Sequence, residues 1–366
     1  MPTVAAVCAY LDRIAPPGLA AAWDNVGMLL GDSAAPVAKV LTCLTVTPAV
    51  VAEAVAERVN LIVTHHPILF RGTKQLSTAS PDGRLLWPLA RAGISVYSPH
   101  TAFDDAADGI NDGLAARLGL TGVSPLRRQD GERTFKVVAF VPDADLAAVS
   151  DAMFAAGAGR IGQYEQCSFR ISGTGTFFGT EDTKPAIGQK GRRENVAEQR
   201  LEIVCPEARL APVLAALRAA HSYEEPAFDV YPLAPASIGG SGRVGTLSMP
   251  VSLRLFAATV KNRLGAGGVQ VVGDPERTVT RVAVACGAAG EFLGEAIAVD
   301  ADVFLTGEMR FHDYLSADAQ GIALVLPGHY ATERPAIEDL ALRLGNEFTA
   351  LKFWASRSEA DPVTWL

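Results

Sequence analysis

The chain has 366 residues, so a norm of about 150 residues per domain predicts two or three domains. Its hydrophobic fraction of 49% and charged fraction of 20% are typical of a folded globular protein and exclude a long disordered or fibrous region. The formal net charge of -8 argues against nucleic-acid binding, because a surface that holds phosphate groups is normally basic.

The sequence also lacks the features of export and membrane insertion. No apolar run approaches the roughly 18 residues of a membrane span, and residues 1–10 lack the basic segment of a signal peptide. The five cysteines are odd in number and never form a C-x-x-C pair, so we expect neither a disulfide framework nor a thiolate zinc site. We therefore expect a cytoplasmic protein with no membrane and no nucleic-acid partner.

The first predicted elements form an α/β half at residues 1–126. Residues 41–66 contain an apolar run, a small-residue turn, a helix and a second apolar run, which predicts a βαβ unit. Residues 93–104 predict a further strand and the turn after it, and a helix follows at 109–118. The turn-rich stretch 121–131 is interpreted as a linker.

A segment of different character follows at residues 131–236. Its patterns predict a strand, a helix, two strands, a helix and a strand, in that order, at residues 134–141, 143–156, 166–178, 198–205, 207–221 and 228–233. This βαββαβ order is the ferredoxin-like pattern. Residues 179–196, rich in Gly, Lys and Arg, predict a mobile loop between the central strands.

The third segment, residues 237–366, repeats the first. After a second expected linker at 237–245, residues 283–308 align without gaps with the first βαβ unit. Residues 321–333 match the later strand and turn with one residue of length difference, and a helix is predicted at 335–344. The expected fold class is therefore α/β, a duplicated core of two similar βαβ-containing halves with an inserted ferredoxin-like domain.

Two adjacent histidines stand at the end of the second apolar run. His65 and His66 follow a predicted strand directly, and Pro67 ends it. Adjacent side chains leave a strand in diverging directions, so two imidazoles here are able to serve two metal ions. Because the carboxyl ends of parallel strands open the binding crevice of an α/β sheet, we expect both halves to face one site.

Two further pairs repeat one spacing. His100 is followed four residues later by Asp104, and His329 by Glu333, which on a helical turn places both side chains on one face. For either pair alone, a structural hydrogen bond is the commoner explanation. Two such pairs at equivalent positions of a duplicated fold, with the double histidine, favour a metal site. Imidazole and carboxylate ligands suit Zn²⁺, Mn²⁺ or Fe²⁺, and the sequence leaves the three open.

Two other polar residues follow the equivalent strand of the second half. Glu308 occupies the repeat position of His66, and His312 comes shortly after it. They are candidates for orienting ligands or transferring protons. Strand-end polar residues that face solvent are the equally good alternative.

Three weaker motifs allow structural explanations. Arg243 in the glycine-rich stretch 239–245 suits an anion, but tight packing or a hinge is the preferred interpretation. Asp24 and Asn25 precede a turn glycine and are expected to support the site rather than contact substrate. His221, at a predicted helix end, is explained by the helix dipole, with a ligand contact as the alternative.

Taken together, the motifs resemble those of the Nif-three-like dinuclear metal-centre family, whose members are often labelled GTP cyclohydrolase I type 2 homologues. The resemblance covers nearly the whole chain and rests on five motifs, at residues 23–31 (WDNVGMLLG), 64–70 (THHPILF), 100–104, 305–313 and 328–333. The insert, through residues 157–177 and 221–233, resembles that of the longer bacterial subtype, which is similar to PII and CutA-type proteins.

The resemblance implies a ligand set and an assembly. The implied ligands of two divalent metal ions per subunit are His65, His66, Asp104, His329 and Glu333. Glu333 is expected to bridge the metals, and His100 is expected to lie behind the ligands rather than on a metal. The implied assembly is a toroidal homohexamer. One departure from the family pattern is Thr45, where relatives commonly carry Asp.

Two functions of different classes follow. The first is a metal-dependent hydrolase acting on a nucleotide or related metabolite, with Glu308, His100 or His312 as proton-transfer candidates. The resemblance suggests GTP, opened at the guanine imidazole ring. The alternative is a non-catalytic metal-handling or regulatory hexamer whose insert senses a small ligand, because fold analogy alone assigns no chemistry.

Overall fold

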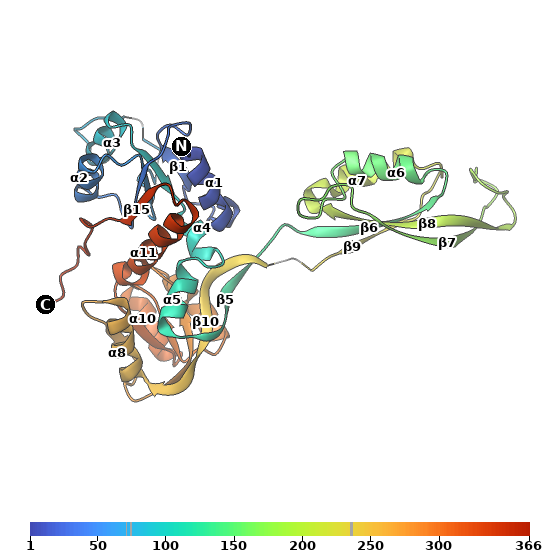
Figure 1. Ribbon diagram of the computed structural model, residues 1–366. Coiled ribbons are helices and arrows are strands. Elements are labelled where there is room, and N and C mark those ends of the chain that lie inside the picture. The colour runs from blue at the N-terminus through green and yellow to red at the C-terminus, as the bar shows by residue number, and fades with distance from the viewer. Residues whose placement is uncertain (71, 74, 235–236) are drawn as a thin grey trace. The chain divides into compact units, whose positions relative to one another are not determined.

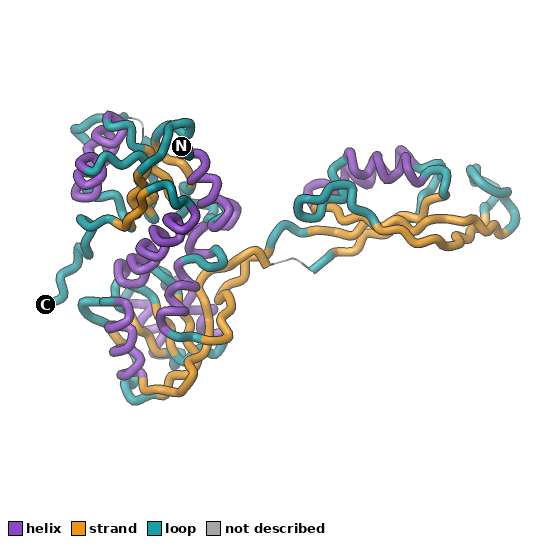
Figure 2. The backbone as a smooth tube through the Cα atoms, viewed as in Figure 1, coloured by secondary structure: helices purple, strands orange, loops and turns teal. Residues whose placement is uncertain are grey.

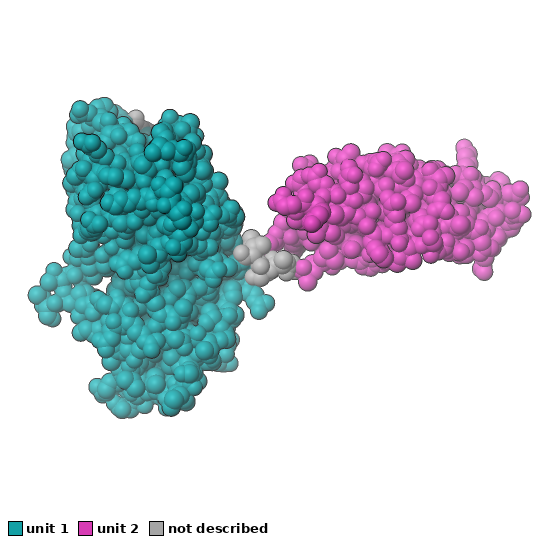
Figure 3. Space-filling model, in the orientation of Figure 1, with its two compact units in different colours: residues 1–129, 238–366 teal, residues 130–237 magenta. Residues whose placement is uncertain are grey.

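The computed structural model describes residues 1–70, 72–73, 75–234 and 237–366. Its contacts divide the chain into two compact units, residues 1–129 with 238–366 and residues 130–237, coloured separately in Figure 3. The expected end of the insert, residue 236, lies outside the described residues. None of the helices in the described ranges is both long and apolar enough to cross a bilayer.

The first unit contains two sheets, of which one belongs mainly to the first half of the chain. Its strand order is β1-β4-β3-β2-β15. The bounds are β1 Gly27–Leu30, β2 Lys39–Cys43, β3 Leu61–Thr64, β4 Ser95–Ser98 and β15 Lys352–Ala355. Strands β15, β2, β3 and β4 pair in parallel, whereas β1 is antiparallel to β4.

The other sheet repeats this core with six strands in the order β11-β14-β13-β12-β10-β5. The bounds are β5 Thr121–Asp130, β10 Ser237–Ser252, β11 Gln270–Val272, β12 Thr278–Val284, β13 Val303–Leu305 and β14 Ala323–Leu326. Strands β12, β13 and β14 are parallel, as β2, β3 and β4 are in the first sheet. The predicted α/β class, with a βαβ unit in each half, is confirmed.

Two stretches that composition predicts as linkers are strands instead. Residues 121–130 form β5 and residues 237–252 form β10, which lies between β5 and β12. The prediction failed because glycines usually mark turns, whereas here Gly240 and Gly242 adopt φ values of +154° and +58° inside a long strand. Strand β15 likewise joins the first sheet although it comes from the end of the chain.

Helices fill the space between the two sheets and cover their outer faces (Figure 1). The central helices are α1 Val4–Ile14, α4 His100–Asp105, α5 Ile110–Leu118, α8 Leu253–Leu264 and α11 His329–Glu347. The outer helices are α2 Pro48–Ala56 and α3 Pro81–Arg91 on the first sheet, and α9 Leu293–Ala298 and α10 Phe311–Ala319 on the second. Short 3-10 turns occur at Pro17–Leu19 and Gly290–Phe292.

The strand sequences match this layering. Leu61 and Val63 of β3 join the central core, whereas Ile62 packs into the outer one, as the two-residue period of a strand requires. In β13, Leu305 faces the central core and Phe304 the outer one. Both faces of each sheet are covered, so these strands are apolar throughout rather than alternating.

Helix α11 begins six residues earlier than predicted. In the structure Gly328, with φ +99°, turns the chain from β14 directly into the helix, and Pro335 lies inside it. The early start places both His329 and Glu333 in helical geometry.

The second unit has the predicted βαββαβ element order. Its elements are β6 Thr134–Pro142, α6 Leu146–Ala155, β7 Phe169–Phe178, β8 Arg193–Pro206, α7 Glu207–Ala220 and β9 Phe228–Pro232. The sheet order is β7-β8-β6-β9 with antiparallel pairing, and Figure 2 shows both helices on one face. The expected loop at 179–196 is shorter, because residues 193–196 extend β8.

Candidate metal centre

Strand ends of both halves meet at one cluster of imidazoles and carboxylates. His65 and His66 follow β3, and α4, which begins directly after β4, carries His100 and Asp104. In the second half, α11 follows β14 and carries Glu333 together with His329. The carboxyl ends of the parallel strands of both sheets therefore supply the cluster, in the position where α/β sheets bind ligands.

Glu333 lies at the centre of this cluster. Its Oε2 atom is 3.2 Å from Nε2 of His66 and 3.1 Å from Nε2 of His329. Its Oε1 atom is 3.9 Å from Nε2 of His65, and the same nitrogen is 3.5 Å from Oδ1 of Asp104. One carboxylate thus contacts imidazoles of both halves, and the five residues of the implied ligand set form a continuous group.

Several buried atoms of the cluster lack hydrogen-bond partners among the described residues. They are both ring nitrogens of His65, Nε2 of His329 and Oε2 of Glu333; the last two atoms lie 3.1 Å apart but do not meet in hydrogen-bond geometry. Buried polar atoms are normally satisfied, so such a concentration requires an explanation. Metal ligation supplies one, because a cation accepts these nitrogen and oxygen lone pairs together. The donor set fits a divalent transition metal, with nitrogen and oxygen ligands and no thiolate.

Two overlapping groups of ligand atoms are close enough to hold one ion each. Within each group the ligand atoms lie within 4.8 Å of one another; the groups are His65, His66 and His100, and His66, His329 and Glu333. His66 belongs to both groups. His100, which the resemblance places behind the ligands, is therefore near enough to act with His65 and His66.

The buried carboxylates and imidazoles of the cluster shift one another's pKa values. Burial alone would raise the pKa of Glu333, but the imidazoles of His329 and His66 outweigh it and hold that pKa well below the ordinary value. Burial, together with the charge of Glu333, raises the pKa of Asp104 far above its usual range. Burial lowers the pKa of His65, which keeps this imidazole neutral and able to bind a metal. A bound cation would stabilise both carboxylates in ionised form.

Three histidines of the cluster are held in place through Nδ1, the ring nitrogen that points away from the other ligand residues. Nδ1 of His100 is 2.7 Å from Oδ1 of Asp24, whose second oxygen accepts the backbone N–H of Thr101 at 3.1 Å. Nδ1 of His66 is 2.7 Å from the hydroxyl of Thr45, and Nδ1 of His329 is 3.0 Å from Glu308. Such contacts orient a ligating imidazole and fix the tautomer that leaves Nε2 free.

Two polar residues that the sequence placed near the site contact its histidines. Asp24 supports His100, as its turn position predicts, and Glu308 contacts His329, as the repeat alignment allows. Thr45, noted only as a departure from the family pattern, occupies the supporting position beside His66. His312 is not brought to the cluster: it lies exposed on the first turn of α10 beside Phe311.

Sequence reasoning missed a glycine that makes room for the central carboxylate. Gly287 follows β12 with φ +65°, and a Cβ atom at this position would lie 2.4 Å from Oε1 of Glu333. The neighbouring Cys286 donates its thiol to Oδ1 of Asp104 at 3.2 Å. The signal in the sequence is a small-residue turn after an apolar strand, which predicts a turn without predicting what approaches it.

A cavity of about 500 Å³ opens beside the cluster. His66, His329 and Glu308 form one part of its wall, and aromatic side chains form another: Tyr314, Tyr330 and Trp365. The volume falls in the range of about 300–1,000 Å³ that small-molecule sites occupy. The cluster is therefore accessible to a ligand of metabolite size.

Two other candidates have structural roles. Arg243 is buried, and its guanidinium donates to both oxygens of Asp112 and to three backbone carbonyl oxygens, those of Ala106, Gly240 and Gly242. No donor remains for an anion. His221 accepts from the backbone N–H of Tyr223 and donates to the carbonyl oxygen of Phe140, so both ring nitrogens are used.

Comparison with known proteins gives matches along the whole chain. Residues 2–362 match the model of the family described as Duf34/NIF3 (NGG1p interacting factor 3). A Mycobacterium tuberculosis protein named "GTP cyclohydrolase 1 type 2 homolog" is 41% identical over 355 residues, which cover 95% of this chain and 92% of that protein. A Bacillus subtilis protein of the same name is 37% identical over 361 residues, with coverage of 97% and 96%.

Solved structures also match the whole chain. A Bacillus cereus protein described as related to NIF3 matches with a TM-score of 0.73 and 33% identity, over 100% of this chain and 99% of its own. A Staphylococcus aureus protein matches with a TM-score of 0.82 and 27% identity over the same shares. Both similarities include the insert as well as the duplicated core.

Proposed function

Because the chain belongs to the Duf34/NIF3 family, we propose that its histidine and carboxylate cluster holds two divalent metal ions and hydrolyses a nucleotide or a related metabolite. The observation that carries the proposal is the position of Glu333, a buried carboxylate in contact with imidazoles from both halves and beside a cavity of metabolite size. A buried carboxylate among several imidazoles would hold divalent cations together with them.

The metal ligands in this proposal are His65, His66, Asp104, His329 and Glu333. Two such ions would supply Lewis acidity, which would activate water and stabilise negative charge that develops on a substrate oxygen. The cluster suits metal ions because both ring nitrogens of His65 and Oε2 of Glu333 are buried without a hydrogen bond. Zn²⁺, Mn²⁺ and Fe²⁺ all suit this donor set.

The remaining polar residues position groups and move protons. Glu308 lies on the cavity wall and is exposed enough to exchange a proton with a bound ligand, while its contact with His329 holds that imidazole in place. Asp24 holds Nδ1 of His100, so that the other ring nitrogen is directed to His65 and His66. Both arrangements use a carboxylate to fix an imidazole, as in other metal-dependent hydrolases.

The cavity suits a flat, partly polar ligand. Tyr314, Tyr330 and Trp365 offer aromatic surface on which a nucleobase is able to stack, and Gln270 adds an amide to the same wall. The name that these relatives share makes GTP the first substrate to test. Access through this cavity favours catalysis over metal storage, because a catalytic site needs an open coordination position.

The test combines metal content with turnover. Protein loaded in turn with Zn²⁺, Mn²⁺ or Fe²⁺ is analysed for metal per chain and assayed for GTP ring opening through the loss of guanine absorbance. We expect two ions per chain and turnover that disappears in His329→Ala. Full metal occupancy without turnover of GTP or of a panel of other nucleotides would overturn the hydrolase assignment and favour the metal-handling alternative.

A further inference from the structure

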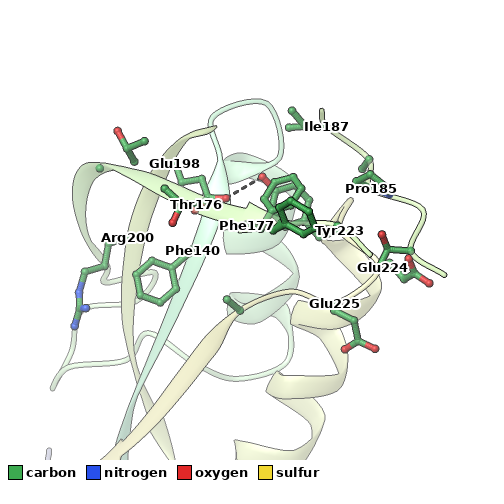
Figure 4. Close-up of a pocket in the computed structure, with 18 of the residues that line it drawn as sticks. Phe140, Thr176, Phe177, Pro185, Ile187, Glu198, Arg200, Tyr223, Glu224 and Glu225 are labelled. Carbon is green, nitrogen blue, oxygen red and sulfur yellow. Dashed lines mark hydrogen bonds between the residues drawn. The ribbon is translucent and has the colours of Figure 1, made fainter. Parts of the chain in front are cut away.

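A second cavity, of about 560 Å³, lies within residues 130–237 and is unrelated to the metal cluster (Figure 4). It opens on the face of the sheet opposite α6 and α7. In β8, Leu201 and Ile203 pack against the helices, so the alternate residues Glu198 and Arg200 face the other way, into the cavity. Its walls are mainly apolar and include Phe140, Ile171, Phe177 and Ile187.

Glu198 is a nearly buried carboxylate within this apolar cavity. Its residue is only 8% exposed, and its Oε1 atom accepts the hydroxyl of Tyr223 at 2.8 Å, the dashed line in Figure 4. Its Oε2 atom accepts no hydrogen bond from any described residue. This oxygen is not among the enclosed atoms without a partner, so it is open to the cavity, where it can accept a donor from outside the chain.

The neighbouring strand leaves room for this carboxylate. A Cβ atom on Gly175 of β7 would lie 2.0 Å from Oε2 of Glu198, and any side chain there would displace the carboxylate. The backbone of Gly175 needs no positive φ, so it is the close approach of Glu198, rather than backbone conformation, that requires glycine.

The charges around the cavity favour a cation. Glu224 and Glu225 add two carboxylates to its wall, on the side opposite Arg200 in Figure 4. Arg200 is the one cationic side chain among the described lining residues, and its Nε donates to Glu202 at 2.9 Å. Its charge is thus already paired, and an anionic ligand would meet net negative potential.

From these contacts we propose that the cavity binds a small organic cation, an ammonium group carried on an aromatic or similarly flat apolar body. The ammonium donates to Oε2 of Glu198, and the apolar body packs on Phe140 and Phe177. The ring of Phe177 adds attraction for the same charge, whereas the ring of Phe140 already lies under the guanidinium of Arg200, 5.8 Å from the ring centre, and supplies apolar contact. The site is independent of the proposed hydrolase activity.

The test uses the full chain and a matched set of three probes. The probes are 2-phenylethylammonium, the neutral 2-phenylethanol and the anionic 3-phenylpropionate, titrated by calorimetry and by ligand-observed NMR. A fragment of this size is expected to bind with a Kd of about 1 mM or tighter. We expect saturable binding of one ammonium probe per chain, with the neutral and anionic analogues at least about tenfold weaker.

Variants separate recognition by Glu198 from general apolar binding. Glu198→Gln keeps an acceptor for Tyr223 but removes the charge, and we expect it to weaken ammonium binding at least about tenfold. Gly175→Ala, which displaces the same carboxylate, should weaken binding similarly. Glu207→Gln makes the same chemical change at the exposed start of α7, outside the cavity, and should leave the affinity unchanged.

Equal affinity for the neutral probe, or unchanged ammonium affinity in Glu198→Gln, would overturn the proposal. So would the absence of saturable binding up to about 10 mM of the ammonium probe. Thermal unfolding and metal content of each variant, matched to the parent protein, ensure that a loss of affinity does not reflect misfolding.

Discussion

The carboxylate of Glu333 lies 3.2 Å from the imidazole of His66, although the two residues belong to different halves of the duplicated core. His66 follows β3 of the first sheet, and Glu333 lies in the helix that follows β14 of the second. A single carboxylate thus joins the polar strand ends of two sheets. The helices packed between the two sheets fix the positions of both strand ends. Substitutions at this contact should therefore weaken metal binding more than they destabilise the fold.

Glu333→Gln should reduce metal content sharply. The amide keeps the shape of the side chain but loses the charge that the surrounding imidazoles and a bound cation both need. We expect affinity to fall by more than the roughly 10- to 100-fold typical of residues that only support a ligand. Metal per chain after dialysis, measured by plasma mass spectrometry, checks this. Glu347→Gln, on the same helix but exposed beside Arg13, is the control and should retain the parent stoichiometry.

Gly287→Ala should also displace metal, through steric contact with Glu333. The added Cβ atom would lie 2.4 Å from Oε1 of that carboxylate. Gly265→Ala is a matched control, because Gly265 has nearly the same φ, +63° against +65°, and a Cβ atom added there would meet no heavy atom within 4 Å. Both variants should lose about 1–2 kcal/mol of stability from the left-handed backbone. Only Gly287→Ala should lose metal, and equal metal retention in both would contradict this account.

Thr45→Val should weaken metal binding, because the imidazole of His66 then loses the hydrogen bond that orients it. The substitution keeps the branched shape but removes the hydroxyl that lies 2.7 Å from Nδ1 of His66. Loss of such a partner typically costs about 10- to 100-fold in metal affinity or activity. Competition with a chromophoric chelator measures the change. Thr45→Ser, which retains the hydroxyl, should restore most of the affinity, and a serine variant as weak as valine would argue against the hydrogen bond.

Glu53 should make the stability of the core depend on acid pH. This carboxylate of α2 accepts hydrogen bonds from the side chains of Trp354 and Ser356 and from the backbone N–H of Ser358. Burial alone would raise the pKa of Glu53, but these hydrogen bonds outweigh it and lower the pKa. The stabilisation is therefore complete above the unfolded-state pKa, about 4.3, and is lost as the pH falls through the lower folded-state value.

Urea unfolding at neutral and acid pH tests this dependence. At pH 7 we expect Glu53→Gln to be less stable than the parent protein by about 1–3 kcal/mol, because donors around the carboxylate lose a charged acceptor. The difference should shrink as the pH falls below about 4 and disappear once the pH is below the lowered folded-state pKa, because both chains are then neutral at this position. Glu57→Gln makes the same change near the end of the same helix, 4.0 Å from Lys39 but without such a set of donors, and should cost less stability at pH 7.

Local patterns in the sequence were sufficient to identify the elements that carry the site. The repeated βαβ units follow from apolar periodicity, and the four-residue spacing of His329 and Glu333 follows from helical geometry, so both are encoded within short stretches of chain. The α/β class was predictable for the same reason. The spacing predicted a shared face for each His and carboxylate pair, although the helix that carries Glu333 begins six residues earlier than predicted.

Other features depend on which distant strands pair, and no local pattern contains that information. Strand β15 joins β2, and the glycine-rich 237–252 stretch becomes a strand, because backbone groups there find partners far along the chain. Local patterns also did not predict the burial of Glu198 in the insert, because the space for its carboxylate depends on Gly175 in the neighbouring strand.

The residue types of the candidate metal centre, and their helical and strand-end spacing, can be read from the chain before it folds, because they follow from periodicities of two and 3.6 residues. The folded chain was needed to show that Glu333 meets His66, that Thr45 supports that histidine, that Gly287 makes room for the carboxylate and that His312 stays outside. Contacts between elements depend on sheet order and on close packing of the core between two sheets, and both arise only when the whole chain folds.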